Sequence, residues 1–159
     1  MCAKKEERQK KRFTRTGNGY TEEALLNFSY SHFVSAVFLM QKSSYHCIFS
    51  AGYLLHLCLE LALKACALHV NDSFLQTHDL LELSVDVAFL NFDENDNEFI
   101  AELNKFYDLR YGIGALDSVG QGDERMCIEM LNKISKTMPE DLYTIFRKVF
   151  NDFFEKQKK

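Results

Sequence analysis

The chain of 159 residues has the length of one domain and a near-average globular composition, with 47% hydrophobic and 26% charged residues. This balance excludes wholesale disorder. One proline and only seven glycines favour long helices over a β fold with many turns, and fourteen phenylalanines predict a core rich in that residue.

The net charge of −4 is divided unevenly along the chain. Residues 1–15 carry seven basic and two acidic side chains, a net charge of +5, which leaves −9 for the rest. We therefore expect a basic, flexible N-terminal arm over residues 1–20 and a folded domain over residues 21–157. The arm has two interpretations: it neutralises phosphates, or it is a solvated terminus that aids solubility.

Cysteine usage and hydropathy indicate where the protein resides. Four of the five cysteines lie among apolar neighbours and none forms a C-x-x-C pair, which is typical of a reducing compartment. The basic N-terminus is not followed by an apolar segment, so we expect no secretory signal. The most apolar stretch, residues 47–70, contains Glu60 and Lys64, so we expect no membrane span. We predict a cytoplasmic protein.

Helical spacing of apolar residues predicts two long helices in the first half, over residues 21–42 and 45–69. Thr21 is suited to cap the first helix, and Glu22 and Glu23 follow in its first turn, where the helix dipole favours acidic side chains. The second helix is apolar on nearly every side, which is typical of a central core helix.

The second half of the chain predicts further helices. A third covers residues 78–90, a fourth begins within residues 91–97 and ends near residue 110, and two more cover residues 123–137 and 139–156. Pro139 opens the last of these at its first position, and four glycines between residues 112 and 122 predict a loop. The predicted fold class is all-α, an antiparallel bundle of five to six helices.

A polar stripe crosses the apolar second helix. His56, Glu60 and Lys64 are spaced by four residues, so they lie along one face, and Glu60 before Lys64 is the favourable order for an ion pair. If this face is buried, its charges need partners on another polar helix, at a subunit interface or in a ligand. The alternative is a partly exposed helix edge that carries an ordinary surface pair.

Two other short segments contain candidate residues. In Thr77-His78-Asp79, an imidazole stands beside a carboxylate, but Thr77 and Asp79 are better suited to cap the following helix than to form an acid–base pair. At the end of the fourth helix, Arg110 is suited to a bidentate phosphate or carboxylate contact, with Glu60 as a possible internal partner. Its alternative role is a favourable interaction with the helix dipole.

Several motifs of known chemistry do not occur in the sequence. It contains no G-x-x-x-x-G-K-[ST], no G-x-G-x-x-G and no H-E-x-x-H, and its five histidines lack the close clustering with cysteine that marks a structural zinc site. The sequence therefore predicts no cofactor and no metal.

Residues 51–65, which contain the polar stripe, resemble the core helix of HEPN domains, with the pattern xxLxHxxxELxLKA. In that family the helix is followed by a turn and His-Asp-Leu, matched here by His78-Asp79-Leu80, and an Arg-Tyr pair near the end of the next long helix is matched by Arg110-Tyr111. The resemblance covers roughly residues 21–155. It implies a helical bundle, commonly dimeric, in RNA metabolism, phage defence or toxin–antitoxin systems.

The resemblance also bears on catalysis. Many HEPN proteins are metal-independent RNases with an R-x(4–6)-H motif, whereas here the positions that would hold the histidine after Arg110 are Ala115, Leu116 and Asp117. This departure implies the non-catalytic branch, whose members bind a nucleotide or RNA or act as partners of minimal nucleotidyltransferases. The ligand-binding candidates that follow are Arg110, Tyr111, Lys64, His56, Glu60, Asp108, His78 and Asp79.

On this interpretation Arg110, Lys64 and His56 hold a phosphate, while Glu60 and Asp108 fix their orientation. Two other hypotheses remain open. The first is a purely structural, homodimeric interaction bundle, in which the stripe specifies the dimer interface. The second is a divergent RNase that uses His56 or His78 in place of the missing histidine.

Overall fold

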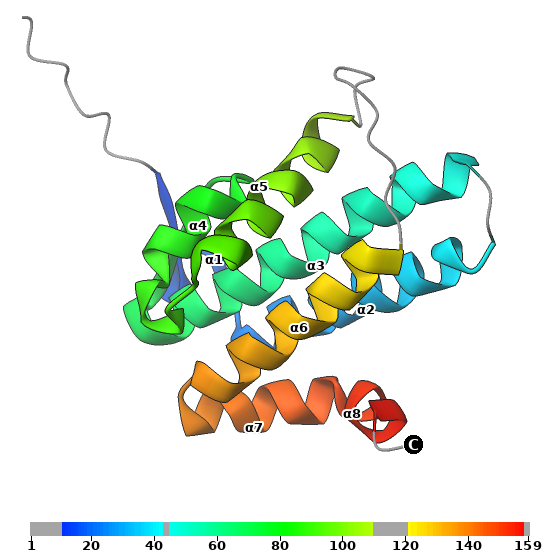
Figure 1. The fold of residues 1–159 in the computed structure, drawn as a ribbon. Coiled ribbons are helices and arrows are strands. Elements are labelled where there is room, and N and C mark those ends of the chain that lie inside the picture. The colour runs from blue at the N-terminus through cyan, green and yellow to red at the C-terminus, as the bar shows by residue number, and fades with distance from the viewer. Residues whose placement is uncertain (1–10, 43–44, 110–120, 158–159) are drawn as a thin grey trace, which may run out of the picture.

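The computed structural model describes residues 11–42, 45–109 and 121–157. Within these ranges the chain is mostly helical, as the composition predicts, with eight α-helices, one 3₁₀ helix and one two-stranded sheet (Figure 1). In chain order the elements are β1 (Arg12–Thr14), α1 (Arg15–Asn18), α2 (Glu22–Met40), α3 (Tyr45–Asn71), β2 (Ser73–Leu75), α4 (Leu80–Asp86), η1 (Ala88–Leu90), α5 (Glu94–Leu109), α6 (Gln121–Thr137), α7 (Glu140–Val149) and α8 (Asn151–Gln157).

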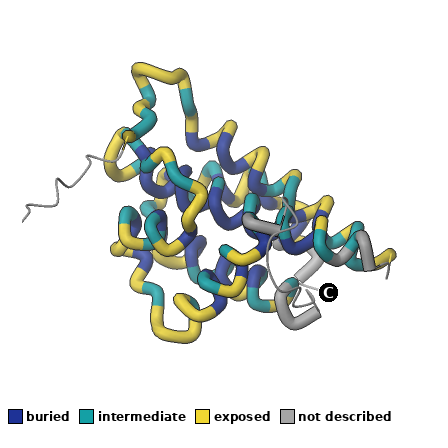
Figure 2. The backbone as a smooth tube through the Cα atoms, turned by 90° about the horizontal axis from the view of Figure 1, so that it is seen from above, coloured by how far each residue is buried: buried dark blue, intermediate teal, exposed yellow. Residues whose placement is uncertain are grey.

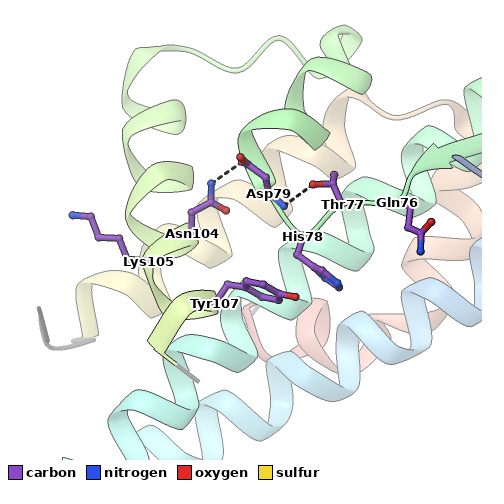
Figure 3. A pocket seen from close by; sticks show the side chains of 7 residues that line it. All are labelled: Gln76, Thr77, His78, Asp79, Asn104, Lys105 and Tyr107. Atoms are coloured by element: carbon purple, nitrogen blue, oxygen red, sulfur yellow. Dashed lines mark hydrogen bonds between the residues drawn. The ribbon is translucent and has the colours of Figure 1, made fainter. Parts of the chain in front are cut away.

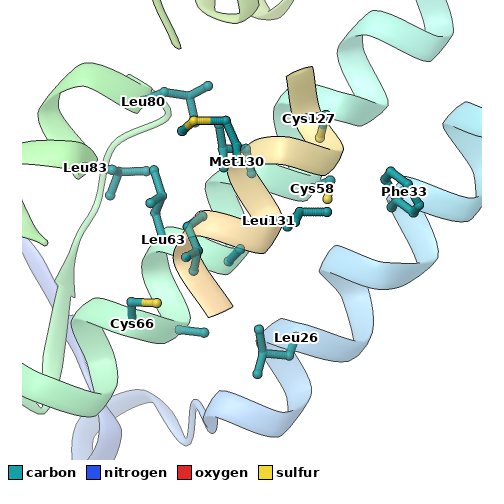
Figure 4. Packing of buried hydrophobic residues seen from close by; sticks show 14 of the residues in the cluster. Leu26, Phe33, Cys58, Leu63, Cys66, Leu80, Leu83, Cys127, Met130 and Leu131 are labelled. Carbon is teal, nitrogen blue, oxygen red and sulfur yellow. The ribbon is translucent and has the colours of Figure 1, made fainter. Parts of the chain in front are cut away.

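Helix α3 is the centre of the fold. It packs against α2 along its length and also against β2, α4, α5 and α6. Buried positions run along the inward faces of these elements (Figure 2). Where α3 and α6 meet, Cys58 lies near Cys127, with Phe33 of α2 on one side and Leu80 and Leu83 of α4 on the other (Figure 4). A helix enclosed on several sides must be apolar nearly all round, which explains its composition.

The same composition gives α3 the appearance of a membrane helix. Its segment Phe49–Asn71 is long and apolar enough to cross a membrane by length and composition, yet 78% of its most apolar window is buried inside the protein. The core helix of a soluble protein has these properties too. The packing of α2, α4, α5 and α6 on α3 accounts for its apolar surface.

The two long helices begin and end close to where the sequence predicts. Thr21 caps α2, its hydroxyl accepting a hydrogen bond from the backbone N–H of Ala24 at 3.2 Å. The four cysteines among the described residues are free thiols, and three of them are buried: Cys58, Cys66 and Cys127. Burial raises the pKa of Cys66 to about 12, so this thiol behaves as an apolar side chain.

The predicted third helix is interrupted. Helix α4 spans only Leu80–Asp86, and Val87 leaves helical geometry before the 3₁₀ turn η1. Asn91 then closes this turn in the left-handed region, with φ of 60°, which asparagine tolerates better than most residues. Val87 and Leu90, on either side of the 3₁₀ turn, are both fully buried. The interruption of the helix therefore allows both side chains to pack in the core.

The predicted last helix is also two helices. Helix α7 ends at Val149 and α8 begins at Asn151, with Phe150 between them. Phe150 is fully buried, stacked on Phe146 with ring centroids 4.3 Å apart, and Phe153 meets it edge-on. The bend brings these three rings into one cluster. Pro139 lies one position earlier than predicted, as the residue that precedes the first turn of α7.

The folded part of the protein begins inside the predicted flexible arm over residues 1–20, so this predicted boundary is wrong. Within the arm, Arg12–Thr14 form strand β1, which pairs antiparallel with β2 so that Phe13 lies opposite Phe74. Their rings are 5.6 Å apart, and the Arg12 guanidinium donates to both Asp86 carboxylate oxygens, at 2.9 and 3.0 Å. A short strand that pairs with a partner sixty residues away leaves no local periodicity, so the sequence gives no signal of it.

Arg15, the first residue of α1, connects the N-terminal segment to α2 through an ion pair. Its guanidinium donates to both carboxylate oxygens of Glu22, at 2.6 and 2.7 Å, and His69 Nδ1 lies 3.1 Å from the same carboxylate. The hydrogen bonds from Arg15 are the main cause that lowers the pKa of Glu22 to about 2, against an opposing effect of burial. A carboxyl group whose pKa is lowered by folding stabilises the native state above its unfolded pKa.

We predict that this stabilisation is lost in acid. The usual pKa of Glu22 is 4.5, so the full effect is expected above pH 5. There the unfolding free energy of wild type should be higher than that of Glu22→Gln by about 2 kcal/mol, a value that allows for solvent around Arg15. The difference should shrink as the pH falls from 4.5 to 2. Urea unfolding across this range measures it, with Glu23→Gln as the exposed control. A difference that stays constant down to pH 2 would contradict the assignment.

Candidate functional site

The polar stripe on α3 is buried, which decides between the two interpretations that the sequence leaves open. The exposed fractions are 0% for His56, 2% for Glu60 and 7% for Lys64, so none lies on a solvated helix edge. A buried carboxylate needs a counter-charge and hydrogen-bond donors, because it has lost its water. The partners of Glu60 therefore define the site.

Two cationic or proton-donating side chains meet the Glu60 carboxylate. Lys64 Nζ, one helical turn further along α3, donates to Oε1 at 2.5 Å, which confirms the predicted ion pair. His78, from the segment that precedes α4, places Nδ1 3.1 Å from each carboxylate oxygen. The aromatic ring of Phe74 lies 5.6 Å from Lys64 Nζ and covers the ammonium group.

His56, the one histidine of the stripe, behaves differently from Lys64. His56 Nδ1 lies 3.8 Å from Glu60 Oε2, and neither ring nitrogen has a hydrogen-bond partner among the described residues. Burial lowers the pKa of His56 by disfavouring the charged ring, although the nearby Glu60 carboxylate acts in the opposite direction. His56 is therefore neutral at neutral pH and enclosed, which does not support a direct contact between its ring and a phosphate.

The chain reverses direction after α3, and this reversal places His78 next to Glu60. Strand β2 follows α3 at once and packs back against it, so the extended segment passes Lys64 at Phe74 and reaches Glu60 at His78. Asp79 then caps α4 by accepting from the backbone N–H of Leu81 at 2.9 Å, and the Thr77 hydroxyl accepts from the N–H of Asp79 at 3.1 Å. The capping interpretation of Thr77 and Asp79 is confirmed.

Helix α5 supplies the other side of the site. The Tyr107 ring stacks on His78, with centroids 4.6 Å apart and planes inclined by 19°, and it also lies 5.3 Å from the His56 ring. One turn earlier, Asn104 donates to Asp79 Oδ1 at 2.9 Å and accepts from the backbone N–H of Leu80 at 2.9 Å. These bonds fix α5 against the start of α4.

A surface pocket opens where these elements meet. It has a volume of about 580 Å³ and is lined by Gln76, Thr77, His78, Asp79, Asn104, Lys105 and Tyr107. Figure 3 shows the His78 and Tyr107 side chains next to each other, below the segment that carries Thr77 and Asp79. The pocket thus has an aromatic wall and a polar rim, and its His78 wall rests on the buried Glu60.

The structure brings five of the eight predicted site residues together: His56, Glu60, Lys64, His78 and Asp79. Arg110 and Tyr111 lie outside the described residues, as does the side chain of Asp108. The predicted pairing of Glu60 with Arg110 therefore stays a prediction, and among the described residues Lys64 and His78 contact Glu60.

Sequence reasoning missed the contributions of Gln76, Asn104 and Lys105 to the pocket, and did not count Tyr107 as a site residue. A signal for two of them exists. Asn104, Tyr107 and Tyr111 are spaced by three and four residues, so they share one helical face that leads to the predicted Arg110-Tyr111 pair. Gln76 lies in the irregular segment after β2, where no periodicity predicts which side chains meet.

Two other hollows offer less chemistry. One, of about 560 Å³ between α5 and α6, is rich in carboxylates, of which Asp93 and Asp96 already pair with Lys133. The other, of about 230 Å³, is mainly apolar and lies against α2. Among the described residues, no group of three or more His, Cys, Asp and Glu side chains is arranged to hold a metal ion.

Comparisons with protein-family models, with curated proteins and with solved structures gave no match to this chain. The function of this protein is therefore inferred from the residues of the pocket and from the resemblance in sequence.

We predict that Glu60 is essential to the stability of the site. Glu60→Gln removes the counter-charge of the buried Lys64, so the unfolding free energy should fall by about 3–5 kcal/mol. The matched control is Glu102→Gln, which breaks the exposed pair with Lys105 and should cost less than about 1 kcal/mol. Urea unfolding measures both.

A second variant separates lost charge from lost packing. Glu60→Gln combined with Lys64→Met leaves no buried charge in the pair, and it should recover much of the lost stability. Equal losses for Glu60→Gln and Glu102→Gln would show that Glu60 is not a buried charge on which the fold depends.

Proposed function

We propose that this protein is a non-catalytic HEPN-type helical domain, with its long helices in an antiparallel bundle, that binds a nucleotide or RNA at the pocket between α4 and α5. The observation that carries the proposal is the stacked His78–Tyr107 pair on the wall of a pocket of about 580 Å³. Nucleobases stack on aromatic side chains irrespective of sequence, which makes such a wall a suitable platform.

The polar rim supports the same class of ligand. Gln76 provides a side-chain amide, whose donor and acceptor match those on base edges, and Lys105, which is paired with Glu102, adds a cationic side chain. Arg110 follows Tyr107 by three residues in the sequence, and an arginine is the residue best suited to bidentate phosphate contact. The volume is within the usual range for small-molecule sites.

We propose binding and not catalysis because the pocket offers few side chains that could act as an acid or a base. His56 is enclosed beneath Tyr107, and Asp79 is engaged as a helix cap. The R-x(4–6)-H motif does not follow Arg110. A homodimeric state, a nucleotidyltransferase partner, a toxin–antitoxin or defence context and a cytoplasmic location are proposed on the family resemblance and composition alone.

We predict that removing the aromatic platform weakens binding. Tyr107→Leu keeps an apolar side chain in contact with His56 but removes the stacking surface, so affinity for ATP and for short single-stranded RNA should fall at least about tenfold. The control is Tyr143→Leu, on α7, which replaces another partly buried tyrosine away from the pocket. Calorimetric titration at low and moderate salt measures the affinity.

The same titration tests the part of the site that lies outside the described residues. Arg110→Ala should also lower the affinity for both ligands and reduce its dependence on salt, because one phosphate contact is lost. Absence of binding by folded wild-type protein to either ligand would overturn the proposal. It would favour the alternative of a purely structural interaction bundle.

A further inference from the structure

We infer that the His78–Glu60 pair makes the pocket selective for ribonucleotides, because the outer nitrogen of His78 accepts a hydrogen bond from the ribose 2′-hydroxyl. This inference rests on the proposed nucleotide-binding function and adds to it the class of sugar. Its basis is the orientation of one imidazole ring, which a buried carboxylate fixes from the inner side.

The position of the proton on His78 follows from its partner. An ionised carboxylate only accepts hydrogen bonds, so the His78 Nδ1 atom, 3.1 Å from both Glu60 oxygens, must carry the hydrogen. In the neutral ring the remaining nitrogen, Nε2, is then an acceptor. Glu60 thereby determines which hydrogen-bonding group the ring presents on its other side.

The charge of Glu60 is balanced within the cluster without His78. The single negative charge of Glu60 is matched by Lys64, whose Nζ donates to Oε1 at 2.5 Å. The buried His56 is neutral because burial lowers its pKa. The pKa of His32, on α2, is also lowered by burial, although Glu60 opposes this effect. The charge of Glu60 is therefore balanced without any charge on His78.

The ring lies where a ligand can reach it. The His78 side chain is 52% exposed, whereas the Glu60 side chain is 3% exposed, so the ring extends from the buried carboxylate at Nδ1 to solvent. The ring also lines the pocket beside Tyr107 (Figure 3). A base stacked on this aromatic wall would place its sugar within reach of the adjacent imidazole edge.

Three other acceptor atoms on this rim already accept hydrogen bonds within the protein. Thr77 Oγ1 accepts from the N–H of Asp79, Asp79 Oδ1 accepts from Asn104 and from Leu81, and Asn104 Oδ1 accepts from Leu80. No hydrogen bond to His78 Nε2 is found in the described part of the chain. A ligand hydroxyl would supply that donor, and the 2′-hydroxyl is the group that distinguishes RNA from DNA.

The experiment compares two ligands that differ only in this hydroxyl. ATP and dATP are titrated calorimetrically at pH 8 into the full-length protein, and short oligo(rA) and oligo(dA) follow as a second matched pair. Wild type should bind the ribose form about tenfold more tightly, the loss expected for one hydrogen bond. Equal affinity for the two sugars, with binding intact, would overturn this inference and leave the proposed function standing.

The variant that isolates Nε2 is His78→Asn. The asparagine amide can still donate to Glu60 in place of Nδ1, but it has no counterpart of Nε2. Its affinities for ATP and dATP should be equal, so the preference for ribose disappears, and both should be lower than in wild type because one ring of the aromatic wall is lost. His69→Asn is the matched control, because His69 also contacts a glutamate, Glu22, but lies outside the pocket, and it should keep the preference.

Two further outcomes are informative. A His78→Asn protein that unfolds at the wild-type temperature yet retains the full preference for ribose would overturn the role of His78. Failure of wild type to bind any of the four ligands would overturn the proposed function and this inference together, which distinguishes that failure from equal binding of the two sugars.

Discussion

The arrangement around the site depends on one buried carboxylate. Glu60 lies in the middle of an apolar helix and is almost completely removed from water, so the rest of the structure must satisfy its charge. Lys64 does so from the next turn of the same helix, and His78 does so from the returning chain. A lysine alone would leave part of the carboxylate without a donor, which explains why the segment after α3 is held so closely against it.

Through His78, the buried Glu60 carboxylate also determines the geometry of the surface pocket. Because His78 is fixed at Nδ1, its ring has a defined position beside Tyr107, and the capping bonds of Asp79 join the same segment to Asn104 on α5. The pocket is thus built on interactions that begin in the core. A change at Glu60 affects both the stability of the fold and the geometry of the wall that contacts a ligand, whereas a change at Tyr107 affects chiefly the wall.

Local features of this fold are readable from the sequence, and long-range ones are not. The bounds of α2 and α3, the Thr21 cap and the Glu60–Lys64 pair all follow from spacing within a single helix. The contact of His78 with Glu60 spans eighteen residues and depends on the chain reversal through β2. The pairing of β1 with β2 and the break at Phe150 are decided by tertiary packing, for which one sequence carries no periodic signal.

The tautomer of His78 set by Glu60 is the central claim, and nuclear magnetic resonance of the ¹⁵N-histidine-labelled protein tests it most directly. Long-range ¹H–¹⁵N correlations at pH 8, assigned with His78→Asn, report which ring nitrogen carries the hydrogen. The structure predicts a protonated Nδ1 and an unprotonated Nε2 for His78, and it predicts that this pattern requires the Glu60 carboxylate. A hydrogen on Nε2 with an unprotonated Nδ1 would contradict the account, because the ring could then neither donate to Glu60 nor accept from a ligand.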